Sequence, residues 1–378
     1  MISINSVLPH EADLASFLSE QLRSFGVEPE WHEVAPGRPN VYASVDFGGS
    51  SPFLVFSGHS DTVPPARDWK SDPFTARERD GKLYGLGAIN MKAGLACMTE
   101  AFVALLRAES LHHRLGRVGL AITVDQEGLS IGAKALLDTE YATCDAMLHA
   151  EHFFGDSPLD YLPNAVTGKV LYRLRVRGRA AHACRPHEGG INAIVDAAKV
   201  VNSIDTLPLR PDPVLGKGTA CVLRIEGGSQ QYSMVVPDRC ELLVTRLTVP
   251  GETKDVAVHD LEDLVDSLRL ASTVEIETPP PSYDPYRLDM ELPFVRTFQD
   301  VYRRVIGTYP HFGPHRGIVD ANVFAAEAGI PTIVFGPKGA NHHRAKEHVA
   351  LSTLEPTARV YAETALEFFS SSHLNSEP

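Results

Sequence analysis

The sequence predicts an α/β fold in which helices cover both faces of a sheet, interrupted by a smaller inserted α+β domain. Short apolar strand patterns alternate with helical patterns before and after the insertion, as in such a sheet. The insertion itself shows a β-α-β-β-α-β order of patterns. With 378 residues and 43% hydrophobic content, the chain can bury two cores. We expect a discontinuous catalytic domain over residues 1–166 and 282–378 and an inserted domain over residues 167–281.

The first expected element is a helix near the start of the chain. Leu14, Phe17, Leu18 and Leu22 recur at helical spacing, and Gly26 follows as a helix-ending glycine would. The other elements expected in this part are a helix at residues 93–108 and strands at residues 53–57, 118–124, 146–150 and 331–336.

The inserted domain is expected to be ferredoxin-like. Its patterns run from about Lys169 to Thr278, and the three prolines Pro279 to Pro281 form a stiff exit. In chain order, the strand and helix segments are VLYRLRVRG, INAIVDAAKVVNSI, TACVLRIEGG, CELLVTRLTV, DVAVHDLEDLVDSLRLA and TVEIE.

Charge and cysteine content restrict the partners and the compartment. Lysine and arginine number 35 against 48 acidic residues, a net charge of -13, which repels phosphate backbones and anionic membrane surfaces. We therefore expect a small-molecule substrate and neither nucleic acid nor a membrane as partner. The five cysteines never form a C-x-x-C pair, no apolar run approaches the roughly 20 residues of a membrane span, and the start lacks a signal peptide. These features predict a cytoplasmic protein.

Four predicted strands end in residues that can bind a metal ion. In an open α/β sheet, ligands bind outside the carboxyl ends of the strands, so these side chains should meet there. Imidazoles and carboxylates without thiolates suit zinc, cobalt or manganese. Taken singly, each residue could instead be an ordinary loop or capping residue. The residues are His59, Asp61, Asp125, Gln126, Glu127, Glu151, His152, His342 and His343.

Eight motifs spread over nearly the whole chain are typical of one enzyme family. They are SGHSDTVP, LYGLGAINMKAG, ITVDQEG, AEHFFG, RGRAAHACRPHEGGINAI, GGSQQYSMVVPDRC, GIPTIVFGP and HHRAKEHV. In these motifs the chain resembles the di-zinc metallopeptidases that include carboxypeptidase G, acetylornithine deacetylase, succinyl-diaminopimelate desuccinylase and aminoacylase. The resemblance implies a zinc-peptidase-like three-layer catalytic domain, a ferredoxin-like lid that also mediates homodimer formation, and one or two zinc ions if the site is still competent.

The resemblance assigns roles to individual residues. His59 and Glu151 correspond to first-metal ligands, and Asp61 to the residue that orients His59. Glu127 and His343 correspond to second-metal ligands. The lid histidine that stabilises the developing oxyanion, often across a dimer in relatives, corresponds to His182.

Two positions depart from the family pattern. Asn90 stands where relatives have the aspartate that bridges two metals, and Gln126 stands where they have the general-base glutamate. A neutral amide adds no negative charge between two cations and accepts no proton near neutral pH. Without an anionic bridge at Asn90, we expect a single metal ion or none to be bound. Without a base at Gln126, the reaction loses a contribution of typically about 10²- to 10⁴-fold, so the usual two-zinc activation of water should be impaired.

Other positions also depart from the family pattern. Leu86 and Ala93 replace an arginine and a glycine of two motifs, and Met234 replaces an asparagine of the lid motif that offers relatives a polar contact to the substrate. Arg246 lies near the family's lid arginine but one residue out of register. Arg246, Met234 and Asn90 are the substrate-binding candidates.

Three functions remain open. The first is hydrolysis of an N-acyl amino acid or small peptide with Asp125, Glu127 or His152 as a substitute base. The second is amide formation, acyl transfer or cyclisation without metal, in which His182 stabilises an oxyanion and Glu127 or Glu151 carries protons. The third is binding of a small molecule without catalysis. As a structural alternative to any of these roles, Asn90 and Gln126 could hydrogen-bond to each other in a metal-free pocket.

Overall fold

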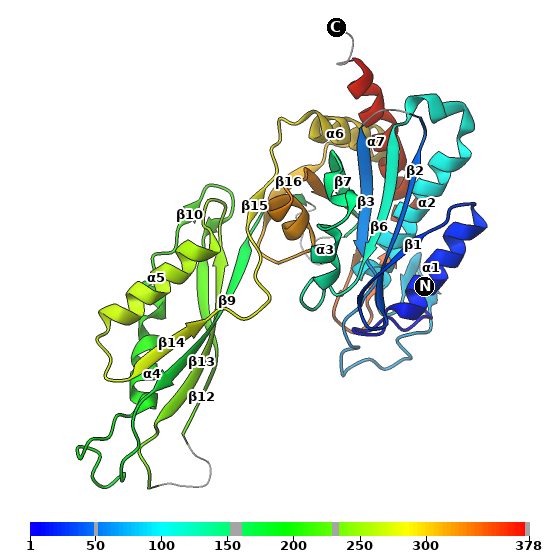
Figure 1. The fold of residues 1–378 in the computed structure, drawn as a ribbon. Coiled ribbons are helices and arrows are strands. Elements are labelled where there is room, and N and C mark those ends of the chain that lie inside the picture. Colours follow the sequence, from blue (N-terminus) through cyan, green and yellow to red (C-terminus); the bar gives the residue numbers. More distant parts are fainter. Residues whose placement is uncertain (49–51, 152–160, 229–233, 375–378) are drawn as a thin grey trace. The chain divides into compact units, whose positions relative to one another are not determined.

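The structure is a computed structural model. It describes residues 1–48, 52–151, 161–228 and 234–374. Two compact units are present (Figure 1). The first comprises Met1–Asn164, Leu288–Gly313 and Val319–Pro378, and the second comprises Ala165–Arg287 and Pro314–Ile318.

The first unit is built on a mixed six-stranded sheet. In spatial order its strands are β1 (Glu30–Ala35), β2 (Arg38–Asp46), β6 (Arg117–Thr123), β3 (Phe53–His59), β7 (Ala146–His149) and β17 (Thr332–Val334). The last four strands pair in parallel, whereas β1 and β2 are antiparallel at one edge. The four strands predicted from the sequence are confirmed as β3, β6, β7 and β17.

Helices cover both faces of this sheet, which confirms the predicted α/β class (Figure 1). Four long helices share one hydrophobic core with Leu54 and Phe56 of β3. They are α1 (Ala12–Ser24), α2 (Ala93–Arg107), α6 (Pro293–Ile306) and α7 (Leu354–Leu374). The short helix α3 (Ile131–Leu136) contacts β1 and β6 on the other side. The two predicted helices are confirmed as α1 and α2.

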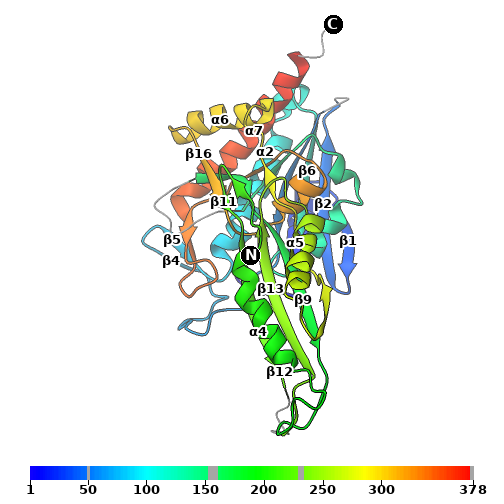
Figure 2. The ribbon, with the colours of Figure 1, turned by 90° about the vertical axis from the view of Figure 1, so that its left-hand side faces the viewer.

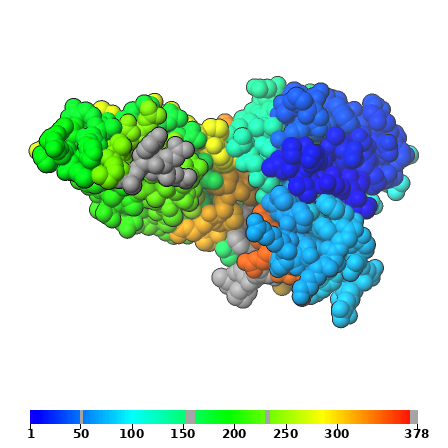
Figure 3. Space-filling model, turned by 90° about the horizontal axis from the view of Figure 1, so that it is seen from below, coloured from blue at the N-terminus to red at the C-terminus, as the bar shows by residue number. Residues whose placement is uncertain are grey.

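Among the described residues, three small sheets are present besides the two main sheets of the units. In spatial order they are β18 (Gly339–Ala340), β19 (His348–Ala350), β5 (Lys82–Tyr84) and β4 (Arg77–Arg79); β15 (Tyr286–Arg287), β8 (Tyr161–Val166) and β16 (His311–His315); and β10 (Pro211–Asp212) with β11 (Gly216–Lys217). Because β19 pairs with β5, residues near 350 lie beside residues near 80 on one face of the first unit (Figure 3). Within the second unit, β15 and the end of β8 pair side by side.

The second unit is an α+β sandwich of one sheet and two helices. Its strands, in spatial order, are β12 (Thr219–Gly227), β13 (Arg239–Thr248), β9 (Gly168–Arg177) and β14 (Thr273–Glu277). The helices α4 (Ala193–Ser203) and α5 (Lys254–Ser267) cover one face of the sheet (Figure 2). Apolar side chains alternate along β9 and β13 and bury against these helices. The chain order β9-α4-β12-β13-α5-β14 confirms the ferredoxin-like prediction.

One segment of the described residues has the length and composition of a membrane span. Ala88–Arg107, 20 residues with a mean hydropathy of 1.4, comprise α2 and the turn before it, in which Asn90 and Met91 depart from helical backbone geometry. The segment contains Asn90, Lys92 and Glu100, so it is not an uninterrupted apolar run and the prediction that no such run is present stands. Most of this segment is buried, because α2 belongs to the core of the first unit.

Candidate active site

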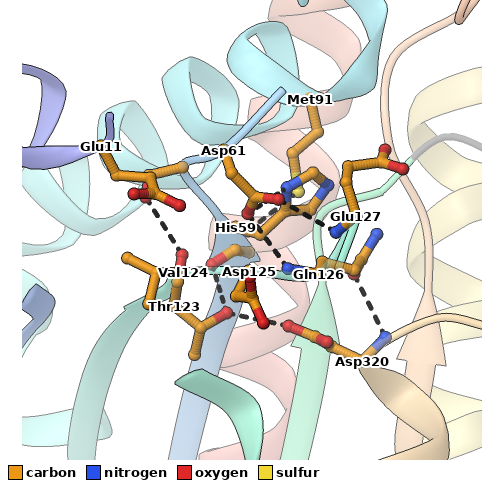
Figure 4. A network of polar contacts seen from close by, with 12 residues as sticks. Glu11, His59, Asp61, Met91, Thr123, Val124, Asp125, Gln126, Glu127 and Asp320 are labelled. Carbon is orange, nitrogen blue, oxygen red and sulfur yellow. Dashed lines mark hydrogen bonds and ion pairs between the residues drawn. The ribbon is translucent and has the colours of Figure 1, made fainter. Parts of the chain in front are cut away.

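The site begins at the end of β3, where the strand leaves the core and delivers two polar side chains. His59 and Asp61 are both completely buried, and His59 Nδ1 lies 3.2 Å from Asp61 Oδ1. Asp61 Oδ2 accepts a 2.9 Å hydrogen bond from the backbone N–H of Glu127. Asp61 Oδ1 accepts a 3.1 Å hydrogen bond from the backbone N–H of Gln126 (Figure 4). Asp61 thus contacts His59 and joins the ends of β3 and β6.

Asn90 lies at the centre of the cluster. Its Nδ2 donates a 2.6 Å hydrogen bond to Glu127 Oε1 and lies 3.0 Å from His343 Nε2. A carboxylate oxygen only accepts, so the amide nitrogen must face Glu127, and Asn90 Oδ1 then faces His59 Nε2 at 3.1 Å. The backbone N–H of Asn90 donates to Glu347 Oε1 at 3.1 Å.

Gln126 is held by groups that fix the orientation of its amide. The backbone N–H of Asp320 donates to Gln126 Oε1 at 3.1 Å, so this atom must be the oxygen (Figure 4). The amide nitrogen therefore faces Glu151 and donates to its Oε2 at 2.8 Å. His149 Nε2 lies 3.2 Å from Gln126 Oε1, and its Nδ1 lies 3.0 Å from Ser57 Oγ.

Asn90 and Gln126 therefore bond to different partners. The hypothesis that the two amides hydrogen-bond to each other is wrong, because each one faces its own carboxylate. Asn90 faces Glu127 and Gln126 faces Glu151.

Asp125 serves as a turn residue and is not available as a base. Its backbone adopts a left-handed conformation with φ of 73°. Its carboxylate accepts from the N–H groups of Leu129 and Ile131, at 2.9 and 3.4 Å, and from Arg38 at 2.8 Å. Arg38 also pairs with the buried carboxylate of Glu11. The hypothesis that Asp125 replaces the catalytic base is wrong, since its oxygens hold the turn that carries Gln126 and Glu127.

The charges of the cluster follow from burial and from close partners. Burial opposes a charge on His59, but the charge and hydrogen bond of Asp61 outweigh it and raise the pKa of His59 to about 10. Both ring nitrogens face oxygen acceptors, which suits a charged imidazolium. Burial would raise the pKa values of Asp61 and Glu151, yet neighbouring histidines hold both pKa values below their usual range. His59 lowers the pKa of Asp61, and His149 and His59 lower the pKa of Glu151.

His343 is the partly exposed member of the cluster. Its Nε2 lies 2.9 Å from Glu127 Oε1, and this hydrogen bond raises the pKa of His343. The side chain of His343 is 42% exposed, whereas that of Glu127 is 13% exposed. His342 contacts His343 ring to ring. His152 lies outside the described residues.

Sequence reasoning missed several buried ionisable residues around the cluster. Burial raises the pKa of Glu347 to about 7, and its carboxylate accepts from three N–H groups of residues 87, 89 and 90. Burial also raises the pKa of Asp320 to about 6 and lowers the pKa of Lys92 to about 8. The His343-x-x-x-Glu347 spacing was a signal for Glu347. For His149, its position at the end of a predicted strand was the available signal.

The predicted lid residues His182 and Met234 lie in the second unit. The backbone N–H of Cys184 donates to His182 Nδ1 at 3.2 Å, so the neutral ring carries its proton on Nε2 and can donate from it. Met234 is 49% exposed, and its backbone carbonyl accepts from Ala183 at 2.9 Å.

The structure contradicts the prediction that Arg246 binds substrate. Its side chain is completely buried in the core of the second unit, where it pairs with Glu252 and, at 2.8 Å, with Asp260. It also donates to the carbonyl oxygen of Ala257 at 3.3 Å. The one-residue register difference seen in the sequence turns the side chain to the helix-covered face of the sheet, because successive strand residues point to opposite faces.

Replacing Arg246 with lysine should destabilise the second unit by about 1–3 kcal/mol, because an ammonium cannot reproduce the planar fork of donors and leaves buried acceptors unpaired. Chemical denaturation measures this loss. Arg224→Lys on the exposed face of the same sheet is the matched control, and it should change stability by less than about 0.5 kcal/mol. Equal stability of the two variants would contradict the assigned role of Arg246.

The residues that would hold a metal pair are His59, Asn90, Glu127, Glu151 and His343. Two dications ~3.5 Å apart repel each other by on the order of 20 kcal/mol at an effective dielectric constant of about 20. This donor set supplies only two carboxylates and no anionic bridge. Among the described residues, no group of three or more His, Cys, Asp or Glu side chains is arranged to hold a metal ion. The residues present do not fit a pair of zinc ions.

Comparison with known proteins identifies the family. A sequence model described as "Peptidase family M20/M25/M40" matches residues 55–367. The chain belongs to this peptidase family. Over 386 residues it is 29% identical to the succinyl-diaminopimelate desuccinylase of Methylorubrum populi, covering 98% of this chain and 97% of the relative. The desuccinylase of Nitrosococcus oceani is 27% identical, with coverage of 96% and 95%.

Solved M20 structures share the fold at low sequence identity. The aminopeptidase PepT of Bacillus cereus matches with a TM-score of 0.80 and 24% identity, covering 97% of this chain and 95% of that one. A dinuclear metal binding peptidase of the M20 family from Bacillus subtilis matches with a TM-score of 0.75 and 14% identity, covering 98% and 95%. These matches confirm the M20 fold with its catalytic and lid domains. The Bacillus subtilis protein is thus a metal-binding member of the family, whereas the donor set of this chain lacks an anionic bridge.

Proposed function

We propose that this M20 family chain acts on the amide C–N bond of an N-acyl amino acid or a small peptide-like molecule, with the usual two-zinc activation of water impaired. The observation that carries the proposal is the convergence of His59, Asp61, Glu127, Glu151 and His343 from separate chain segments into one cluster. Relatives named as desuccinylases and peptidases support an amide substrate.

The chain's own residues offer a route for the protons of hydrolysis. Water adds to the carbonyl carbon, the C–N bond breaks, and the proton lost by water goes to the leaving nitrogen. Gln126 cannot accept that proton. The Glu127–His343 pair can, because it joins a carboxylate to a partly exposed imidazole at 2.9 Å. We assign His182 Nε2–H to stabilise the oxyanion, since its Nδ1 is already occupied by the Cys184 N–H.

Turnover of a substrate panel tests this proposal. The panel contains N-succinyl and N-acetyl amino acids and dipeptides, with release of the free amine as the readout. We expect slow cleavage of at least one class, reduced by His343→Ala and preserved by His342→Ala, the neighbouring control. Stoichiometric binding of an amide with no turnover would identify a binding protein and reject the enzyme proposal.

A second candidate is amide formation, acyl transfer or cyclisation. The observation that favours it is the locked amide of Gln126, which donates to Glu151 and accepts from the Asp320 N–H, so that the base position cannot activate water. Incubation with an acyl donor and an amine, followed by mass spectrometry, distinguishes the candidates. Amide product that depends on His182, with hydrolysis absent, would favour this candidate over the first.

We also propose a cytoplasmic homodimer formed through the lid. All five cysteines of the chain are free thiols, which suits a reducing compartment. β12 is an edge strand of the lid sheet, and its residues Leu223 and Ile225 are 53% and 50% exposed. An edge strand with exposed apolar side chains is a ready site for pairing with a second copy.

An Ile225→Lys variant should therefore be monomeric, because a charged side chain on an edge strand opposes strand pairing. Light scattering after size-exclusion chromatography measures the mass. Val195→Lys is the matched control, since Val195 is equally exposed, at 53%, but lies on α4. A monomeric wild type, or a dimer that survives Ile225→Lys, would contradict this interface.

A further inference from the structure

The amides of Asn90 and Gln126 stand where the family pattern places carboxylates, and their NH₂ groups point at the remaining carboxylates. Asn90 Nδ2 lies 2.6 Å from Glu127 Oε1, and Gln126 Nε2 lies 2.8 Å from Glu151 Oε2. These are hydrogen-bond distances. Ligand atoms around a tetrahedral zinc ion with bonds of about 2.0–2.1 Å lie about 3.3–3.4 Å apart.

The orientation of both amides follows from their neighbours. The Asp320 N–H fixes Gln126 Oε1, and the carboxylate of Glu127 fixes Asn90 Nδ2. An amide NH₂ group has no lone pair for a cation, so neither nitrogen can become a metal ligand. Rotating Gln126 to offer its oxygen to a metal would set its NH₂ against the Asp320 N–H, which also only donates.

Each amide also removes the need for a cation. Glu151 is 7% exposed, and a buried carboxylate without a partner is strongly unfavourable. In a metal enzyme the metal supplies that partner. Here Gln126 supplies one to Glu151 and Asn90 supplies one to Glu127, so the cluster is assembled by direct hydrogen bonds among its own side chains.

We propose that Asn90 and Gln126 replace the metal pair as the groups that hold this site together, so that this chain is a metal-independent member of the M20 family. This inference concerns binding of metal and does not depend on which reaction the site carries out. It extends to any M20 chain that carries both amides at these positions.

Metal binding without substrate tests the inference. The wild-type protein, purified without chelator, is analysed for metal content and then heated with and without zinc. We expect no bound zinc and no zinc-dependent change of Tm. The double variant Asn90→Asp with Gln126→Glu should bind zinc, and its Tm should rise by roughly 5 °C or more at zinc a hundredfold above Kd.

A control variant separates this effect from added charge. Gln21→Glu with Asn202→Asp makes the same changes at exposed positions of α1 and α4, and should gain no zinc-dependent Tm rise. One or two zinc ions bound tightly to the wild type would overturn the inference. A folded double variant that binds no zinc would overturn the assigned role of the two amides. If the double variant fails to fold, the wild-type metal content still decides the question.

Discussion

A His182→Ala variant is expected to lower kcat by about 10²- to 10³-fold, the usual cost of removing one oxyanion donor. The expectation rests on the proposed role of His182 as the oxyanion donor, and the hydrogen bond from the Cys184 N–H to His182 Nδ1 leaves Nε2–H to serve as that donor. His182 is exposed within the second unit, so the fold should not depend on it. Steady-state kinetics on the substrate found by the panel measure the loss.

The distinguishing readout is the division between kcat and KM. An oxyanion donor acts in the transition state, so kcat should fall while KM changes little. His187→Ala, at an exposed position of the same loop, is the matched control and should leave both constants unchanged. A rise in KM with constant kcat would make His182 a substrate-binding residue. Unchanged kinetics would remove it from the site.

An Arg38→Ala variant is expected to lose about 3–5 kcal/mol of unfolding free energy, because it leaves two buried carboxylates without their cation. Arg38 joins Glu11, which is completely buried, to Asp125, whose side chain is 5% exposed. It should also lower activity, since Asp125 holds the turn that presents Gln126 and Glu127 to Asp61. Denaturant titration and the substrate assay measure the two effects.

Two further variants refine this expectation. Arg23→Ala breaks an exposed ion pair with Glu28 and should cost less than about 1 kcal/mol. Asp125→Asn keeps the size of the turn residue but weakens its bond to Arg38, so its cost should lie between the two. An Arg38→Ala protein as stable as Arg23→Ala would show that the buried charges are compensated in another way.

Much of the fold was predictable because its signals are local. The alternating apolar residues of β9 and β13 and the helical spacing of α1 follow from burial of one face, and a single sequence displays both patterns. The main polar cluster was predictable for a related reason. Parallel strands end at the same edge, so the residues that follow β3, β6 and β7 had to meet there.

The incorrect predictions concern residues whose role depends on strand register or on a specific hydrogen-bond partner. Arg246 is a residue type that often binds substrate, but its position one residue out of register along β13 buries its side chain against α5. Asp125 has the chemistry of a base, but its left-handed backbone and three donors make it a turn residue. The role of Asp125 depends on Arg38, which lies 87 residues away in the chain and is not part of any local pattern. The burial of Arg246 follows the alternation of β13, because Arg246 continues the buried positions Leu242 and Val244.

The pairing of β15 with the end of β8 marks the junction at which the lid domain could be replaced by that of another protein. Tyr286 lies opposite Val166 and Arg287 opposite Ala165, so the incoming and outgoing strands are neighbours. Paired strands are about 5 Å apart, a gap that a two-residue turn can close. A chimera that joins these two strands directly, or that grafts another family member's insert between them, would need no long linker at the junction.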